Sequence, residues 1–170
     1  MTEIINHRIT AQITGEPVLF LTGMRINRWW RVREWLSVLG AAIGMRRELE
    51  SDPQLGLLGQ QTWLGRTIII VQYWESYEAL ERWARDRQRA HLPAWRAFMK
   101  RIGLSGKVGI WHETYRITPG NYETIYVNMP AFGLAEATTA LPITSRIDSA
   151  RARMNAGREA GEAGERGVAA

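Results

Sequence analysis

The chain has 170 residues, of which 45% are hydrophobic and 23% are charged, as expected for one globular domain with a buried core. It contains no cysteine, which excludes disulfides, thiolate zinc sites, iron–sulfur clusters and cysteine nucleophiles. The formal net charge is +5, but the arginines are scattered singly among acidic residues, so we expect no nucleic-acid partner.

The N-terminal residues do not resemble a targeting segment. Glu3, His7 and Arg8 interrupt what would have to be the apolar core of a signal peptide. No window approaches the roughly 20 apolar residues that are needed to span a bilayer. We therefore expect a cytoplasmic protein without a membrane span.

A strand and a helix are predicted at the start of the domain. Residues 18–26 are apolar and β-prone, which favours a strand. From residue 29 to about 49, apolar side chains recur every three or four positions, which predicts a helix with one buried stripe. Asn27 offers a cap for this helix.

A hairpin and a second helix follow. The runs 57–64 and 67–74 are β-prone and are joined at Gly65 and Arg66, which predicts a two-residue connection. Ser76 begins an imperfect capping box for the next helix.

The second helix is predicted to bend or restart near His91, because Pro93 disfavours helix in the residue before it. Residues 107–117 then alternate as a strand, with His112 and Glu113 on opposite faces. Since these two side chains diverge, they are not expected to act as a pair in one cavity.

The order strand, helix, strand, strand, helix, strand predicts an α+β fold of the ferredoxin-like βαββαβ kind, with an antiparallel sheet. Residues 1–16 are expected to be an N-terminal extension, and residues 17–144 the domain. A further short strand is expected over 122–127. Residues 145–170 have almost no large apolar side chains, which indicates a flexible or frayed helical tail.

Five segments in chain order resemble a small bacterial and fungal family named for the polyketide monooxygenase of fumagillin biosynthesis. They are 22–30 (TGMRINRWW), 72–76 (QYWES), 91–98 (HLPAWRAF), 109–115 (GIWHETY) and 128–133 (NMPAFG). This family is similar to the dimeric α+β barrel superfamily, which includes antibiotic-biosynthesis monooxygenases, haem-degrading monooxygenases and aldoxime dehydratases. The resemblance implies a homodimer and a cavity between the sheet and its two helices.

Two histidines are the candidate catalytic residues and haem ligands. On a continuous helix His91 lies 11 positions after Leu80, which returns it to within about 20° of that apolar residue. Haem-degrading members resemble this chain in having an axial histidine a little after a helix tryptophan, here Trp83. His112 lies in the last strand and is the alternative ligand or general base. A structural role for either histidine remains open.

Arg25 and Asn27 end the first strand, where superfamily members often place a polar residue that orients oxygen or substrate. Arg25 is the candidate partner of a haem propionate, of an acidic substrate or of an internal carboxylate such as Glu113. The internal ion pair is the favoured of the three. Asn27 is a candidate substrate-binding residue.

Aromatic side chains supply the remaining candidates. The eight tryptophans are more often core than site, but some could line a flat apolar pocket. Trp74 and Trp83 are assigned to cofactor binding. The other candidate substrate-binding residues are Trp30, Trp95, Tyr126 and Asn128.

We therefore predict a monooxygenase-like enzyme that oxidises a hydrophobic organic substrate, either with haem b or without a cofactor. No glycine-rich phosphate loop is present, which disfavours flavin and nicotinamide cofactors. The alternatives are a haem-dependent lyase resembling aldoxime dehydratase and a non-catalytic protein that binds haem or a lipophile.

Overall fold

The computed structural model describes residues 3–168, and a four-stranded antiparallel sheet lies at its centre in the order β3–β4–β2–β5. The strands are β2 (Val18–Ile26), β3 (Leu57–Trp63), β4 (Thr67–Trp74) and β5 (Val108–Arg116). The first strand of the unit lies between its third and fourth, which is the ferredoxin-like arrangement. The predicted α+β fold is therefore confirmed.

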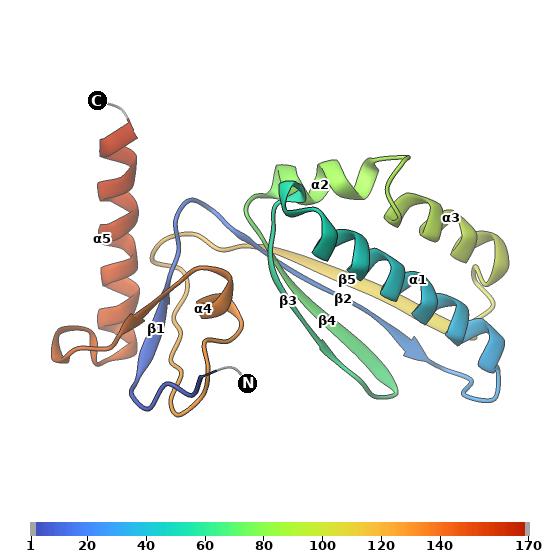
Figure 1. Cartoon of the computed structure of the whole chain (residues 1–170), viewed down its shortest axis with the longest axis horizontal. Helices are drawn as coiled ribbons and strands as arrows, with labels where there is room; N and C mark the ends of the chain where they lie inside the picture. Colours follow the sequence, from blue (N-terminus) through green and yellow to red (C-terminus); the bar gives the residue numbers. More distant parts are fainter. Residues whose placement is uncertain (1–2, 169–170) are drawn as a thin grey trace.

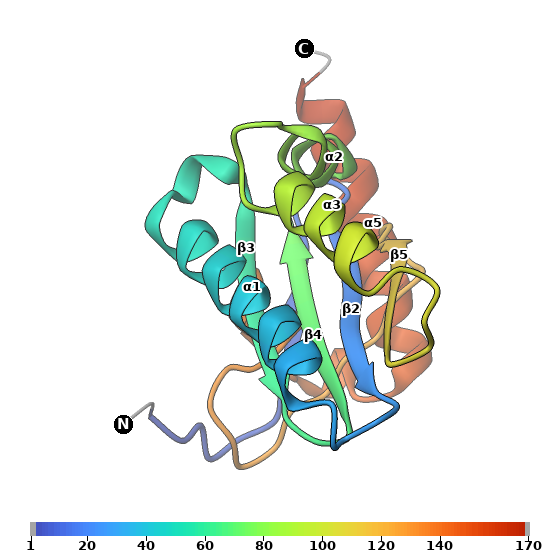
Figure 2. The same ribbon diagram turned by 90° about the vertical axis from the view of Figure 1, so that its right-hand side faces the viewer.

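Three helices cover one face of this sheet (Figure 1 and Figure 2). They are α1 (Val32–Ser51), α2 (Tyr77–Arg85) and α3 (His91–Arg101). Ser76 caps α2 as predicted, because its Oγ accepts a hydrogen bond from the backbone N–H of Ala79 at 3.2 Å. The predicted restart before Pro93 is also present, since α3 begins at His91.

Two local predictions are wrong. Asn27 does not cap α1, which begins at Val32; instead its Nδ2 donates to the carbonyl oxygen of Gly106 at 3.2 Å. The β3–β4 connection is longer than two residues, because Trp63 lies opposite Ile69. The wider turn lets the carbonyl of Arg66 accept a hydrogen bond from the backbone N–H of Ile26 at 2.9 Å.

The core between sheet and helices has two halves. Near α2, a buried cluster joins the sheet to the helices and contains Val18, Phe20, Leu49, Trp74, Ala79, Leu80 and Trp83. Near the end of α3, a second cluster contains Met24, Ile68, Ile102 and Val108. Alternate residues of β2 therefore point toward the helices, as the period of a strand requires.

A second lobe contains segments from both ends of the chain (Figure 1). Strand β1 (Ile9–Gln12), within the predicted N-terminal extension, pairs antiparallel with β6 (Thr139–Pro142). The lobe also contains α4 (Leu134–Ala137) and α5 (Ala150–Val168), and the 3₁₀ turn η2 (Ser145–Ile147); the other 3₁₀ turn, η1 (Pro53–Leu55), follows α1.

The rest of this lobe differs in detail from the sequence expectations. Residues 122–127 make only an isolated bridge, Ile9 to Tyr126, rather than a strand. Arg153 of α5 is largely buried and ion-paired with Glu123, so this part of the predicted tail packs on the lobe.

The second lobe covers part of the sheet face that the helices leave open, over β3 and the end of β4. There, Gln61 Nε2 donates to Glu136 Oε2 at 2.6 Å, and the rings of Trp63 and Phe132 meet edge to face. In the described part of the chain, no helix has the length and apolarity required to cross a membrane.

Candidate functional site

His91 is the first residue of α3, and one of its ring nitrogens has a fixed partner. Nδ1 lies 3.0 Å from the carbonyl oxygen of Ala84. Because a carbonyl oxygen only accepts, Nδ1 must carry the proton of the neutral ring, and Nε2 then carries the lone pair. In this tautomer a histidine can act as a base or as a metal ligand through Nε2.

The junction between α2 and α3 is held to the end of α1 by one carboxylate. Glu48 Oε2 accepts from Trp83 Nε1 at 3.3 Å and from the backbone N–H of Ala90 at 3.0 Å. Arg89 adds ion pairs with Asp52, at 3.0 Å, and with Glu48, at 3.8 Å. Glu48 was not recognised from the sequence, because a glutamate on a helix carries no signal that separates it from a solvated surface residue.

Trp83 and Trp74 connect His91 to the centre of the core. The ring of Trp83 lies 5.1 Å from that of His91 and 5.4 Å from that of Trp74. Trp74 has no exposed surface, and its Nε1 donates to Gln72 Oε1 at 3.2 Å. Trp74 therefore presents no surface to solvent, and its ring supports Trp83 from within the core.

His112 lies on the same side of the sheet as the helices. It is in register with Thr22 on β2, and its ring lies 5.6 Å from that of Phe20, a member of the same buried cluster as Trp74 and Trp83. Its side chain is nevertheless exposed, because β5 is an edge strand. Each histidine thus contacts a member of the same buried cluster, His91 through Trp83 and His112 through Phe20.

Arg25 lies apart from both histidines. It is on the opposite face of β2 from Met24 and donates from Nη1 to Thr67 Oγ1 at 3.1 Å. The predicted ion pair with Glu113 is absent from the described residues, since Arg25 is in register with Gly109, four positions away along β5. Glu113 instead accepts from the Tyr115 hydroxyl at 2.7 Å.

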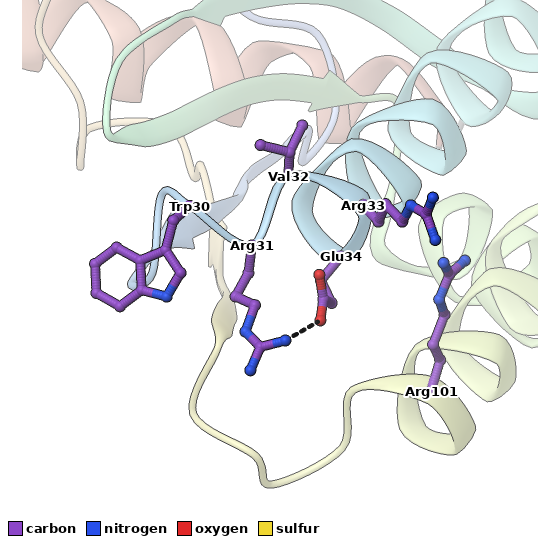
Figure 3. Close-up of a pocket in the computed structure, with 6 residues that line it drawn as sticks. All are labelled: Trp30, Arg31, Val32, Arg33, Glu34 and Arg101. Atoms are coloured by element: carbon purple, nitrogen blue, oxygen red, sulfur yellow. Dashed lines mark ion pairs between the residues drawn. The ribbon is translucent and has the colours of Figure 1, made fainter.

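Trp30 and Trp95 are exposed tryptophans outside this buried cluster. Trp30 lines an open groove of about 480 Å³ between the start of α1 and the end of α3 (Figure 3). The other lining residues are Arg31, Val32, Arg33, Glu34 and Arg101. Trp95 lies one turn after His91 on α3, is half exposed, and stacks on Phe98 with ring centroids 6.2 Å apart.

Tyr126 and Asn128 belong to the second lobe. The hydroxyls of Tyr126 and of Tyr73 meet at Gly133, where an added Cβ would lie 3.7 Å and 3.3 Å from them. Burial raises the pKa of both phenols above the ordinary value of 10.0, so both stay protonated at neutral pH. Asn128 is exposed in a left-handed turn, with φ of 53°.

The predicted site residues therefore separate into groups. His91, His112 and Trp83 share the helix side of the sheet, with Trp74 buried behind them and Trp95 on the next turn of α3. Asn27 and Trp30 lie at the end of the sheet, Arg25 on its open face, and Tyr126 and Asn128 in the second lobe.

Comparison with known proteins places this fold in a family. The family model described as Monooxygenase af470-like matches residues 17–134. Monooxygenase af470 of Aspergillus fumigatus is 29% identical over 149 residues, which cover 75% of this chain and 53% of that protein. The chain thus spans about half the length of this curated relative.

Two solved structures share the fold. An aldoxime dehydratase in complex with butyraldoxime has a TM-score of 0.58 and 17% identity, over 76% of this chain and 41% of its own. Another aldoxime dehydratase structure has a TM-score of 0.62 and 16% identity, over 81% of this chain and 43% of its own. The family match covers the whole ferredoxin-like unit, from β2 to β5, and more than half of the chain, so the chain belongs to the Monooxygenase af470-like family.

Proposed function

We propose that this protein is a monooxygenase-like enzyme that oxidises a hydrophobic organic substrate on the helix side of its sheet, beside His91 and His112. Family membership supports the class of reaction. The observation that carries the site is the placement of His91: its Nδ1 is bound to the carbonyl of Ala84 and its ring packs on Trp83, so Nε2 is the group available for chemistry.

In the cofactor-free form of this proposal, His91 Nε2 is the general base. It removes a proton from an acidic CH₂ group or a phenol of the substrate, and the resulting anion reduces molecular oxygen. One oxygen atom stays in the product and the other leaves as water, so that a CH₂ group becomes a carbonyl. Trp95, half exposed one turn after His91, offers an aromatic surface that suits a flat, electron-rich substrate.

His91 also fits the role of a haem ligand. A histidine whose Nδ1 is bound to a backbone carbonyl is an ordinary axial ligand through Nε2, and His91 meets this condition. Bound haem would supply the redox chemistry with oxygen. Arg25 does not fit the predicted role of holding a propionate beside His91, because it lies on the other face of the sheet.

We further propose that the protein is a homodimer that pairs through the open face of the sheet. On this face, Leu21, Val71 and Trp111 lie on the adjacent strands β2, β4 and β5, while the second lobe covers β3 and Tyr73 near the end of β4. The Val71→Arg substitution would place a charge in the middle of this interface. Light scattering should then show a dimer for the wild type and a monomer for Val71→Arg; a wild-type monomer would refute the dimer.

Oxygen consumption tests the proposed activity. The purified protein, with and without added haemin, is given electron-rich aromatic and polyketide-like compounds. We expect uptake that His91→Ala lowers by at least a hundredfold, and that Arg47→Gln, on an exposed part of α1, leaves unchanged. A Soret band lost in His91→Ala would select the haem form. Dehydration of an aldoxime without oxygen uptake would show a lyase, and binding without turnover would show a carrier.

A further inference from the structure

Three loops meet at one end of the sheet, and we call this region the loop end. They connect β2 to α1 (residues 27–31), β3 to β4 (64–66) and α3 to β5 (102–107). Backbone hydrogen bonds join them: Ile26 N–H donates to the carbonyl of Arg66 at 2.9 Å, and Asn27 N–H to that of Lys107 at 3.2 Å. The three tips therefore form one surface at the end of the sheet away from the start of α3 (Figure 1), where His91 lies.

Large apolar side chains project from all three loops. Leu104 is 99% exposed and Leu64 is 79% exposed, while the neighbouring Trp29 and Trp30 are 74% and 61% exposed. Single exposed apolar residues are ordinary, but four at the tips of converging loops are not. Leucine tips beside paired tryptophans have the composition of a surface that enters the outer part of a lipid bilayer.

The same surface is strongly basic. The segments 25–36, 62–69 and 98–109 together contain eight arginines and lysines but one acidic residue, Glu34. Glu34 is already paired with Lys107 at 3.3 Å and with Arg31 at 3.9 Å. Among the described residues, no carboxylate pairs with the other six, which are Arg25, Arg28, Arg33, Arg66, Lys100 and Arg101.

Two of these arginines converge at the groove that Trp30 lines. In Figure 3 the guanidinium groups of Arg33 on α1 and Arg101 on α3 are turned toward each other, with no acidic group between them. Two facing cations repel unless an anion lies between them, and a phosphate group satisfies both through paired hydrogen bonds. The arginines that are scattered along the sequence are thus brought together by the fold.

We propose that the loop end binds the surface of an anionic lipid bilayer. The exposed arginines and lysines attract the phosphate headgroups, and Trp29, Trp30, Leu64 and Leu104 enter the interface. A nucleic acid would use the charge but would not need fully exposed leucines. This inference is independent of the proposed oxygenase activity, because none of its residues contacts His91 or His112.

Vesicle sedimentation tests the proposal with the full chain. Vesicles of phosphatidylcholine alone are compared with vesicles that contain 30% phosphatidylglycerol, at low and at high salt. We expect binding to the anionic vesicles only, weakened by salt. Arg33→Gln with Arg101→Gln should weaken binding on the order of fivefold for each charge removed. Leu64→Ser with Leu104→Ser should weaken it at least tenfold, since two apolar anchors are lost.

Arg47→Gln with Arg87→Gln is the matched control, because both arginines are exposed and lie at the opposite end of the helices. This control should bind vesicles like the wild type, and circular dichroism should show that all variants are folded. Absence of binding to anionic vesicles would overturn the proposal. So would binding that the arginine variant weakens but the leucine variant does not, or equal or tighter binding to a DNA duplex, since either would identify a general polyanion surface.

Discussion

The imidazole of His91 packs on the indole of Trp83 with ring centroids 5.1 Å apart, while its Nδ1 is hydrogen-bonded to Ala84. Trp83 is itself fixed by Glu48 and by the fully buried Trp74. The orientation of the proposed catalytic group is therefore set by the core of the protein rather than by a flexible loop.

The first prediction concerns the two histidines. His91→Ala should lower oxygen uptake at least a hundredfold and cost about 1 kcal/mol of unfolding free energy from the lost hydrogen bond. Added imidazole should restore part of the activity. His112→Ala removes an exposed side chain that makes no hydrogen bond within the described residues, and it should lower activity only about tenfold by weakening substrate binding. The assignment fails if His112→Ala is the more damaging substitution.

The second prediction concerns Trp83. Trp83→Ala removes a ring that is 4% exposed and should lower the unfolding free energy by roughly 3–5 kcal/mol. Trp95→Ala, four residues after His91 and half exposed, is the control and should cost much less. Urea denaturation measures both. Similar losses for the two variants would show that the α2–α3 junction is not the packed support described above.

The third prediction concerns two glycines. A Cβ at Gly23 would overlap the carbonyl oxygen of Ile68, so Gly23→Ala should destabilise the sheet by roughly 1–3 kcal/mol. Gly40 is exposed within α1 with nothing near its Cβ position, so Gly40→Ala should stabilise by about 0.8–1.0 kcal/mol. Thermal unfolding should therefore shift in opposite directions for the two variants; a neutral Gly23→Ala would contradict this strand geometry.

The fourth prediction concerns pH. Burial raises the pKa of Tyr73 and Tyr126 above 10.0, so above pH 10 the folded state binds more protons than the unfolded state. Stability is therefore fully present below pH 10 and falls as pH rises beyond it. Tyr73→Phe should reduce this fall, measured as unfolding free energy at pH 8 and 10.5. An unchanged fall in Tyr73→Phe would place the cause elsewhere.

The strands could be predicted because their apolar runs end at clear turn residues. The start of α1 could not, since Trp29 and Trp30 fit the helical period. Asn27 and Arg28 hold this loop by donating to the carbonyl of Lys107, a contact that no local pattern encodes. The pairing of β1 with β6 was missed for the same reason, because it joins segments from opposite ends of the chain.

The candidate site was predictable in part. Helical spacing placed His91 near the core, and strand alternation separated His112 from Glu113. The contact of His91 with Ala84 depends on the path of the chain between α2 and α3, which periodicity does not describe. The sheet face on which Arg25 lies could have been predicted from its neighbour Met24, because adjacent residues of a strand point to opposite faces. The distance of Arg25 from Glu113, however, depends on the register of β5 with β2.

The most direct test of the central claim is the origin of the oxygen in the product. Substrates that support oxygen uptake are converted under ¹⁸O₂ and analysed by mass spectrometry, with wild type and His91→Ala compared. The account predicts one ¹⁸O atom in each product molecule, formed at least a hundredfold more slowly by His91→Ala. A product that takes its oxygen from water, or one that His91→Ala forms at the wild-type rate, would contradict it.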